Sequence, residues 1–229
     1  MGNTRRGRST ALRGAGGFTL AETLIAAAIG AVILLGLYLV YDVNQVTFIK
    51  GEQLADLQQN ARIGIDRIVR ELRLAGFYPE DPPVIPPVCP TAIQSATATS
   101  IRFLADIDSD GKTERVEYSY SGCAPDCAAD PPRIQRERWR ELTGGPCDAD
   151  ASWWDSGGAQ PFTERVATNP PGFAFAYFDS AGNPIPAPVL PGSLGNIRRI
   201  SVTITTQDTQ TGSTAQPFTL RAEVRPRNL

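Results

Sequence analysis

Hydrophobic residues are concentrated in one continuous run near the start of the chain, from Gly17 to Tyr41. The run contains a single acid, Glu22, followed by nineteen uncharged residues from Thr23 to Tyr41. About 20 apolar residues in a helix are enough to cross the hydrocarbon core of a bilayer. The pattern therefore predicts a transmembrane helix. A carboxylate at the edge of such a helix is costly in lipid, which makes Glu22 a candidate functional residue.

After Asp42 the helical pattern continues but becomes amphipathic. Charged residues, Glu71 among them, alternate with one apolar stripe, and this arrangement is typical of a helix packed along a soluble domain. Gly76 is a suitable C-cap and Pro79 cannot continue the helix, so one helix is predicted from about Phe18 to Ala75. The residues of the stripe are Val46, Ile49, Leu54, Leu57, Ala61, Ile65, Ile68, Leu72 and Ala75.

Beyond a proline-rich connection at 79–98, the pattern changes to short strands. Alternating residues predict strands at 101–104 and 116–120, joined by the turn DIDSDGKT, and further strands at 172–179, 198–206 and 218–224. Residues 121–161 are weakly patterned, and we expect an irregular region there with one short strand near 134–139. An antiparallel sheet with one buried face needs a cover, which the stripe of residues 54–75 supplies. The predicted fold class is α+β, a long N-terminal helix packed on an antiparallel β-sheet.

Charge divides the chain unevenly. The 229 residues carry a net charge of −2, but residues 1–17 hold four arginines and no acid. The remainder has 18 basic against 24 acidic residues, a net charge of −6. The arginines are expected to keep the N-terminus in the cytoplasm and send the C-terminal domain outward. A domain this acidic, with no basic stripe in its sequence, would repel the phosphates of a nucleic acid. This argues against direct nucleic-acid binding.

The absence of histidine excludes Ser–His and Cys–His catalysis and zinc sites that use histidine. No catalytic motif or pair of carboxylates stands out, so we do not expect an enzyme. The four cysteines, Cys89, Cys123, Cys127 and Cys147, all follow the apolar run. An even count on an exported domain favours disulfides, with three connectivities open, over reduced thiols or a metal site.

Two further features are candidate binding sites. Asp106, Asp108, Asp110 and Glu114 form D-x-D-x-D-G-x-x-E, which resembles the start of a calcium loop, although the last acid comes too early for an EF-hand. The alternative is a hydrophilic hairpin turn, because Asp and Gly tolerate tight backbone geometry. Calcium is a candidate ligand, but no cofactor is required. The three tryptophans, Trp139, Trp153 and Trp154, are either an adhesive surface or ordinary packing residues.

The N-terminal residues carry a resemblance to a known family. A basic leader ending in glycine, then Phe18, Thr19, Leu20 and Glu22, then an apolar run, resembles the class III signal of type IV pilins and type II secretion pseudopilins. The resemblance implies cleavage between Gly17 and Phe18 by prepilin peptidase, N-methylation of Phe18, and an assembly role for Glu22. It also implies the type IV pilin fold. The expected divisions are a cytoplasmic leader peptide (1–17), a transmembrane and assembly helix (18–41), an amphipathic half-helix (42–78) and a periplasmic β-rich domain (79–229).

The second half of the helix resembles the minor pilin group called PilW. The residues that carry this resemblance are Gln58, Asn60, Ala61 and Arg62, then Arg73, Ala75, Gly76 and Phe77. It implies a single-pass inner-membrane subunit used in initiation or tip assembly of a type IV pilus. Its partners would be other minor and major pilins, prepilin peptidase and the inner-membrane assembly platform. The alternatives are a type II secretion minor pseudopilin, and a tip adhesin or calcium-responsive binding module.

Overall fold

The structure is a computed structural model that describes residues 17–77, 91–122, 131–141, 154–168, 170–207 and 217–229. Its contacts divide the chain into two compact units, Met1–Ile49 and Lys50–Leu229, and each is described by itself. One α-helix, α1 (Leu20–Arg73, 54 residues), contributes to both. The predicted continuous helix from about Phe18 to Ala75 is therefore confirmed.

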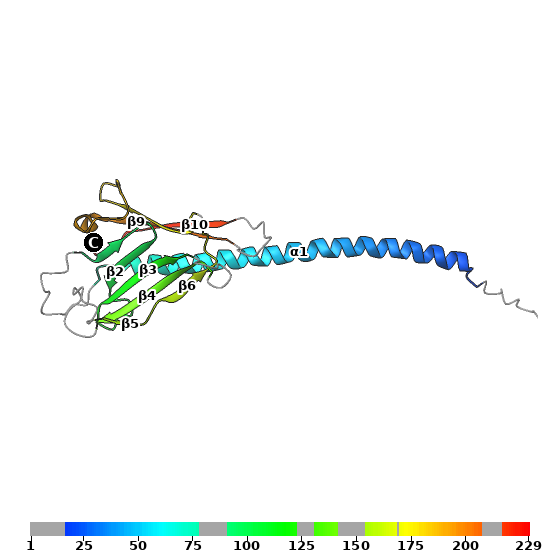
Figure 1. The fold of residues 1–229 in the computed structure, drawn as a ribbon, viewed down its shortest axis with the longest axis horizontal. Coiled ribbons are helices and arrows are strands. Elements are labelled where there is room, and N and C mark those ends of the chain that lie inside the picture. The colour runs from blue at the N-terminus through cyan, green and yellow to red at the C-terminus, as the bar shows by residue number, and fades with distance from the viewer. Residues whose placement is uncertain (1–16, 78–90, 123–130, 142–153, 169, 208–216) are drawn as a thin grey trace, which may run out of the picture. The chain divides into compact units, whose positions relative to one another are not determined.

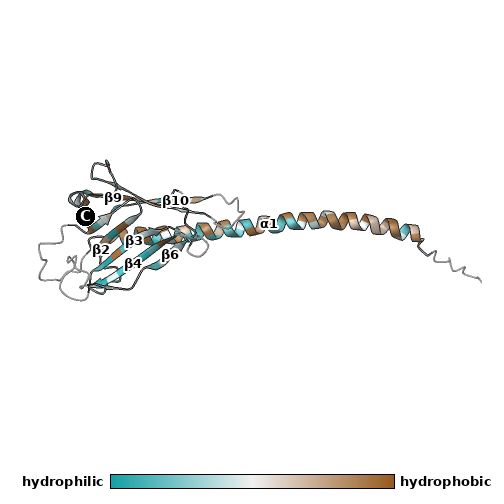
Figure 2. Ribbon diagram, viewed as in Figure 1, coloured by the Kyte–Doolittle hydropathy of each residue, from teal (hydrophilic) through white to brown (hydrophobic). Residues whose placement is uncertain are grey.

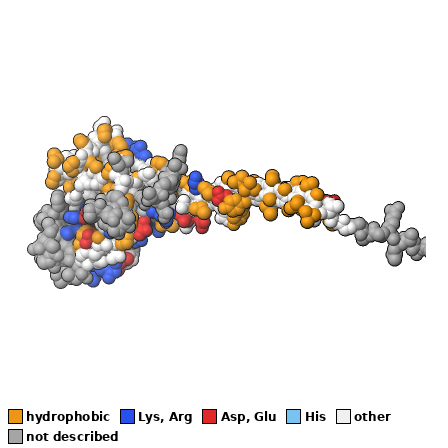
Figure 3. All heavy atoms as spheres, turned by 45° about the vertical axis from the view of Figure 1, so that its right-hand side comes forward, with side chains coloured by type: hydrophobic (Ala, Val, Ile, Leu, Met, Phe, Trp, Pro, Cys, Tyr) orange, Lys and Arg blue, Asp and Glu red, His pale blue; other side chains and the backbone are white. Residues whose placement is uncertain are grey.

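The first stretch of α1 is apolar and exposed. Between residues 20 and 49 every side chain is exposed, and only Gly30 is partly covered. Figure 2 shows the brown, hydrophobic colour running along this stretch, and teal residues become frequent toward the other end of the helix. In Figure 3 hydrophobic side chains cover much of the visible surface of the same stretch. Within its own chain, this stretch buries none of its large apolar side chains.

The second stretch of α1 is buried on one side, starting at Leu57. The predicted stripe is correct from this point onward, but Val46, Ile49 and Leu54 are 44%, 51% and 42% exposed. The reason is the length of the sheet beside the helix, because Thr206, the last residue of strand β9 (Arg199–Thr206), donates its hydroxyl to the Leu57 carbonyl at 3.4 Å. The buried residues of α1 are Leu57, Ala61, Gly64, Ile65, Ile68, Glu71 and Leu72.

The first sheet has six strands in the order β1-β2-β3-β4-β5, and β6 also pairs with β4. All the pairs are antiparallel. The predicted hairpin is confirmed, because β2 and β3 lie on either side of the acidic turn and pair with each other. The pairing begins next to the turn, where Ala105 lies opposite Glu114. The strands are β1 (Ile93–Ala96), β2 (Ser100–Ala105), β3 (Glu114–Ser121), β4 (Arg133–Glu141), β5 (Trp154–Ser156) and β6 (Gln160–Glu164).

A second, four-stranded antiparallel sheet has the order β10-β9-β7-β8. Its longer strands are the three predicted from alternation, and a 3-10 helix, η2 (Pro191–Asn196), precedes β9. The alternating pattern predicts one sheet, whereas the described residues form two. The strands are β7 (Phe173–Phe178), β8 (Pro184–Ile185), β9 (Arg199–Thr206) and β10 (Phe218–Val224).

Both sheets bury their apolar faces in one core with the second stretch of α1. Gly64 marks the contact, because a Cβ there would lie 2.6 Å from the Thr163 hydroxyl of β6 and 3.5 Å from Ile204 of β9. The helix therefore lies against a strand of each sheet, as Figure 1 shows for the cyan part of α1. This arrangement agrees with the predicted α+β class and is consistent with the pilin fold.

The end of α1 is fixed by the backbone. Gly76 has a φ of +81°, which a glycine C-cap permits. Its N–H donates to the Leu104 carbonyl of β2 at 2.9 Å, and Asp106 donates its N–H to the Phe77 carbonyl at 3.0 Å. The helix end is thus tied to the strand that leads into the acidic turn.

Candidate functional site

The predicted cleavage site lies immediately before the first turn of α1. Residues 17–19 have no regular secondary structure, and Phe18 is 82% exposed. The helix then begins at Leu20. A peptide bond has to be accessible and outside a helix to enter a protease site in extended form, and the Gly17–Phe18 bond meets both conditions.

Thr19 and Glu22 explain why the helix begins there. The Glu22 N–H donates to Thr19 Oγ1 at 3.3 Å, and the Thr23 N–H donates to the Thr19 carbonyl at 3.1 Å. Thr19 is therefore the N-cap, and Glu22 is the third helical residue, the spacing of a capping box. The carboxylate also lies in the first turn, where the positive end of the helix dipole favours an acid. Glu22 thus has a local role in helix initiation.

The residues after Glu22 form an apolar surface without a partner in the described chain. Leu24, Ile25, Val32 and Leu35 are all more than 60% exposed. Among the described residues, α1 is the helix long and apolar enough, by length and composition, to cross a membrane. In water this much exposed apolar surface is unfavourable, so the stretch requires lipid or other helices around it.

Residues 12–38 match the prokaryotic N-terminal methylation motif. This match supports a type IV pilin-like protein. It covers the predicted cleavage site, Glu22 and most of the apolar run, and it implies processing by prepilin peptidase and assembly with other pilins. Together with the apolar helix it indicates membrane anchoring. A search of curated proteins gives no match to this chain, and neither does a search of solved structures.

The acidic turn brings together three of its four predicted calcium ligands. Carboxylate oxygens of Asp106, Asp108 and Glu114 all lie within 4.8 Å of one another. Asp110 lies outside this group and accepts the Lys112 N–H at 2.9 Å. The structure thus brings three of the four candidate ligands together, and calcium binding at the turn stays a prediction.

The three grouped carboxylates already have partners. Asp106 accepts the N–H groups of Ser109 and Gly111 at 2.7 and 3.2 Å, and Glu114 accepts the Ile107 N–H at 2.8 Å. Asp108 pairs with Arg138 at 3.0 Å, and Arg140 lies 3.8 Å away. These contacts also support the alternative interpretation, an acidic hairpin turn held by its own hydrogen bonds.

The two acids facing each other in this turn have opposite pKa shifts. Burial raises the pKa of Glu114 to about 7, and the charges of Asp108 and Asp110 act in the same direction. Burial would raise the pKa of Asp108 too, but the Arg138 guanidinium beside it outweighs that effect and lowers it. At neutral pH the turn therefore holds an ionised Asp108 and a partly protonated Glu114.

Glu71 lies on the buried face of α1, although its charge predicts a position on the exposed face. It is only 4% exposed, and it lies among the buried residues of α1. Its position follows from helical spacing, because it is three residues after Ile68 and four before Ala75, both on the buried stripe. The helical spacing alone therefore predicts that Glu71 is buried, whereas its charge predicts that it is exposed.

The Glu71 carboxylate joins α1 to two strands. It accepts the Tyr118 hydroxyl of β3 at 2.6 Å and Arg136 Nε of β4 at 3.0 Å, and Arg67 Nε lies 3.0 Å from its other oxygen. Burial, with Glu71 beside it, raises the pKa of Tyr118 well above its usual value. Burial would lower the pKa of Arg136, but the Glu71 carboxylate outweighs this and raises it. The buried acid is therefore fully paired.

The remaining predicted residues are only partly described. All four cysteines and Trp153 lie outside the described residues, so the disulfide prediction stays a prediction. Trp154 begins β5, and Trp139 is half-buried on β4 with the Arg102 guanidinium 5.5 Å from its ring centre. Trp139 is thus engaged within the chain rather than displayed as a free aromatic. In the weakly patterned region of residues 121–161 the sequence predicts one short strand, near 134–139. The structure also shows β5 and the start of β6 there.

Proposed function

We propose that this protein is a minor pilin of the PilW group, processed by prepilin peptidase and used to start or cap a type IV pilus. The observation that carries the proposal is an exposed Gly17–Phe18 bond directly before a capped helix with an unpartnered apolar surface. A subunit stored in a membrane and transferred to a helical filament needs both features. The role is structural rather than enzymatic.

Glu22 is the residue that makes assembly specific in this proposal. Cleavage after Gly17 creates a new α-amino group on Phe18, four residues before the carboxylate. An acid surrounded by lipid or packed helices requires a cation, and this amino group of the same or a neighbouring subunit provides one. Joining the filament would then satisfy a charge that is costly in the membrane.

Processing is tested by replacing Gly17. Gly17→Val is expected to block cleavage and methylation because the bulkier residue occupies the position before the scissile bond. Mass spectrometry of the membrane fraction would show the uncut chain, whereas Gly16→Ala, the matched change one residue earlier, would yield residues 18–229 with one added methyl group. Normal cleavage of Gly17→Val would contradict the proposal.

Assembly is tested by Glu22→Ala, with Glu52→Ala as the control on an exposed site of the same helix. Glu22→Ala is expected to be processed normally but to reduce surface pili strongly. Site-specific cross-linking from residue 24 identifies the neighbours and separates a pilus from the alternative, a type II secretion pseudopilus. Normal piliation of Glu22→Ala would remove the assembly role.

Calcium binding at the acidic turn is a second proposal. The proximity of the Asp106, Asp108 and Glu114 oxygens favours it, while the ion pairs of Asp108 with two arginines compete with a metal. Calcium should raise the melting temperature of the full chain in detergent, and Asp106→Asn should abolish the rise. An unchanged melting temperature at millimolar calcium would leave the turn as a structural hairpin.

A further inference from the structure

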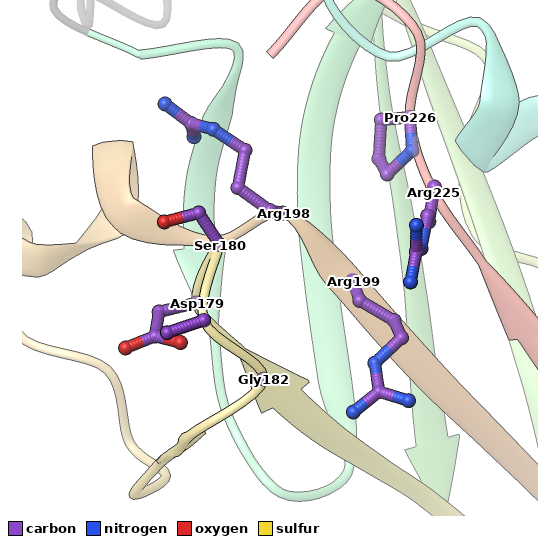
Figure 4. Close-up of a pocket in the computed structure, with 8 residues that line it drawn as sticks. Asp179, Ser180, Gly182, Arg198, Arg199, Arg225 and Pro226 are labelled. Carbon is purple, nitrogen blue, oxygen red and sulfur yellow. The ribbon is translucent and has the colours of Figure 1, made fainter.

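A basic cleft lies at the second sheet, and none of its lining residues belongs to the acidic turn. Its volume is about 530 Å³, and its walls are Arg198, Arg199, Arg225, Pro226 and the turn of residues 179–182 between β7 and β8. Figure 4 shows the side chains of Arg199 and Arg225 extending in the same direction, while Arg198 extends to the opposite side. Two guanidinium groups thus share one side of the cleft.

The arginines of this cleft are poorly neutralised by the chain. Arg225 is exposed, and its guanidinium makes no hydrogen bond or ion pair with the described residues. Arg198 donates to the carbonyls of Gly195 and Ile197 at 2.6 and 2.9 Å, which carry no net charge. Arg199 pairs with Glu223 at 3.0 Å, but Glu223 also lies 3.4 Å from Arg221. Among the described residues, Arg199 is therefore the one of these three arginines that pairs with an acid.

The acid at the edge of the cleft is already engaged in its own turn. Asp179 accepts the backbone N–H and the side-chain amide of Asn183 at 2.8 and 3.0 Å. In Figure 4 its carboxylate points away from Arg199 and Arg225. The hydrogen bonds from Asn183 lower the pKa of Asp179, so it stays ionised at the edge, where it forms no ion pair with a described arginine. The cleft retains a positive potential.

This potential contrasts with the rest of the protein, because the chain after residue 17 has a net charge of −6. Guanidinium groups bind carboxylates and phosphates through paired N–H donors. A nucleic acid would bring a long row of phosphates against the acidic remainder of the molecule. Single-stranded nucleic acids bind by stacking their bases on aromatic rings, but the Phe178 ring is already covered by the Arg199 guanidinium, 4.2 Å from the ring centre. A short acidic segment avoids both difficulties.

We propose that the Arg199–Arg225 cleft is a docking site for a carboxylate-rich segment of a neighbouring protein subunit. The guanidinium of Arg225 supplies the free charge, and Arg199 supplies a second donor held in place by Phe178 and Glu223. Only the identity of the neighbour as another pilin-like subunit rests on the proposed function. The carboxylate chemistry of the cleft stands independently of processing and assembly.

The test uses the full mature chain in a nonionic detergent and a short fluorescein-labelled polyglutamate peptide, with binding followed by fluorescence anisotropy. Arg225→Glu is expected to weaken binding by about tenfold or more, since it replaces the free guanidinium by a like charge. Arg225→Gln should give a smaller loss. Arg62→Glu, which makes the same change of charge on an exposed position of α1, is the matched control and should leave binding within about twofold.

Three results would overturn the proposal: no binding of the peptide by the wild-type chain, equal binding by Arg225→Glu, or an equal loss in Arg62→Glu. A short DNA duplex is run in parallel, and tighter binding of DNA that is lost in Arg225→Glu would reassign the cleft to nucleic acid. Arg225 is exposed, so its replacement is not expected to disturb folding. An unchanged melting temperature of the variant verifies this. Mass spectrometry of Phe18 methylation reports separately on the proposed function.

Discussion

Helix α1 contains two stretches of similar residue types with different surroundings. Residues 20–49 expose leucine, isoleucine and valine throughout, whereas from Leu57 onward the leucines and isoleucines on one face of the helix are buried against two sheets. The second stretch satisfies its apolar face within the chain. The first stretch cannot, and it depends on lipid or on other subunits. One helix thus combines an exposed apolar segment with a core element of the folded domain.

The same contrast separates the two glutamates at the ends of the helix. Glu22 is exposed in the first turn, and its one described contact is its backbone N–H to Thr19. Glu71 is buried, and its carboxylate is bound by Tyr118, Arg136 and Arg67. An acid that is already paired stabilises the domain, whereas an unpaired acid is available to a partner. The stabilising effect of the paired acid is measurable as the free energy of unfolding of the full chain in detergent.

The largest effect is expected for Glu71→Ala. Removing the carboxylate leaves Arg136 and the Tyr118 hydroxyl buried without their acceptor, which costs about 3–5 kcal/mol of stability when one partner of a buried pair is lost. Urea unfolding followed by circular dichroism measures it. Asp66→Ala, an exposed acid on the same helix, is the control and should change stability by less than about 0.5 kcal/mol. Similar stabilities of the two variants would show that the network does not hold the helix.

Gly64→Ala should have the second largest effect. The added Cβ would meet the Thr163 hydroxyl at 2.6 Å in the contact between helix and sheets. Overpacking of this kind costs about 1–3 kcal/mol, because the helix or the strand has to shift. The same unfolding measurement tests it. A stability equal to or above that of the wild type would mean that the contact is looser than the structure indicates.

The pH dependence of stability is expected to follow Glu114. Its pKa rises from 4.5 to about 7 in the folded chain, so its neutral form stabilises the fold. This contribution is fully present below 4.5 and is lost as pH rises through 7, with a slope of at most about 1.4 kcal/mol per pH unit. Glu114→Gln should flatten the slope in that range, while Asp56→Asn, at an exposed position of α1, should leave it. An unchanged slope in Glu114→Gln would assign it to another group.

Much of the fold could be predicted because its pattern is local. The apolar run and the stripe from Leu57 identify the helix, and strict alternation identifies β7, β9 and β10. The start of the candidate site could also be predicted, because glycine, phenylalanine, an N-cap threonine and a glutamate three residues later stand next to each other in sequence. Residues 12–38, which carry this information, match the methylation motif.

Features that depend on distant contacts could not be predicted in the same way. Glu71 is charged, so only its partners on β3 and β4 explain its burial. The limit of the buried stripe at Leu57 depends on where β9 ends. Arg199 and Arg225 are 26 residues apart in sequence and meet only through the pairing of β9 with β10. Sequence patterns describe an element's own periodicity, and these features belong to pairs of elements.

The smallest effect, and one of opposite sign, is expected for Gly51→Ala. Gly51 lies on α1 about two turns before Leu57, and a Cβ there meets nothing within 4 Å. Alanine should therefore raise stability by about 0.5–1 kcal/mol, because it restricts the unfolded chain and adds no clash. Gly64→Ala is the same substitution on the same helix and should lower it. The two variants, unfolded side by side, locate the boundary where the helix begins to pack on the domain. A loss of stability in Gly51→Ala would place that boundary earlier than Leu57 and shorten the exposed apolar stretch.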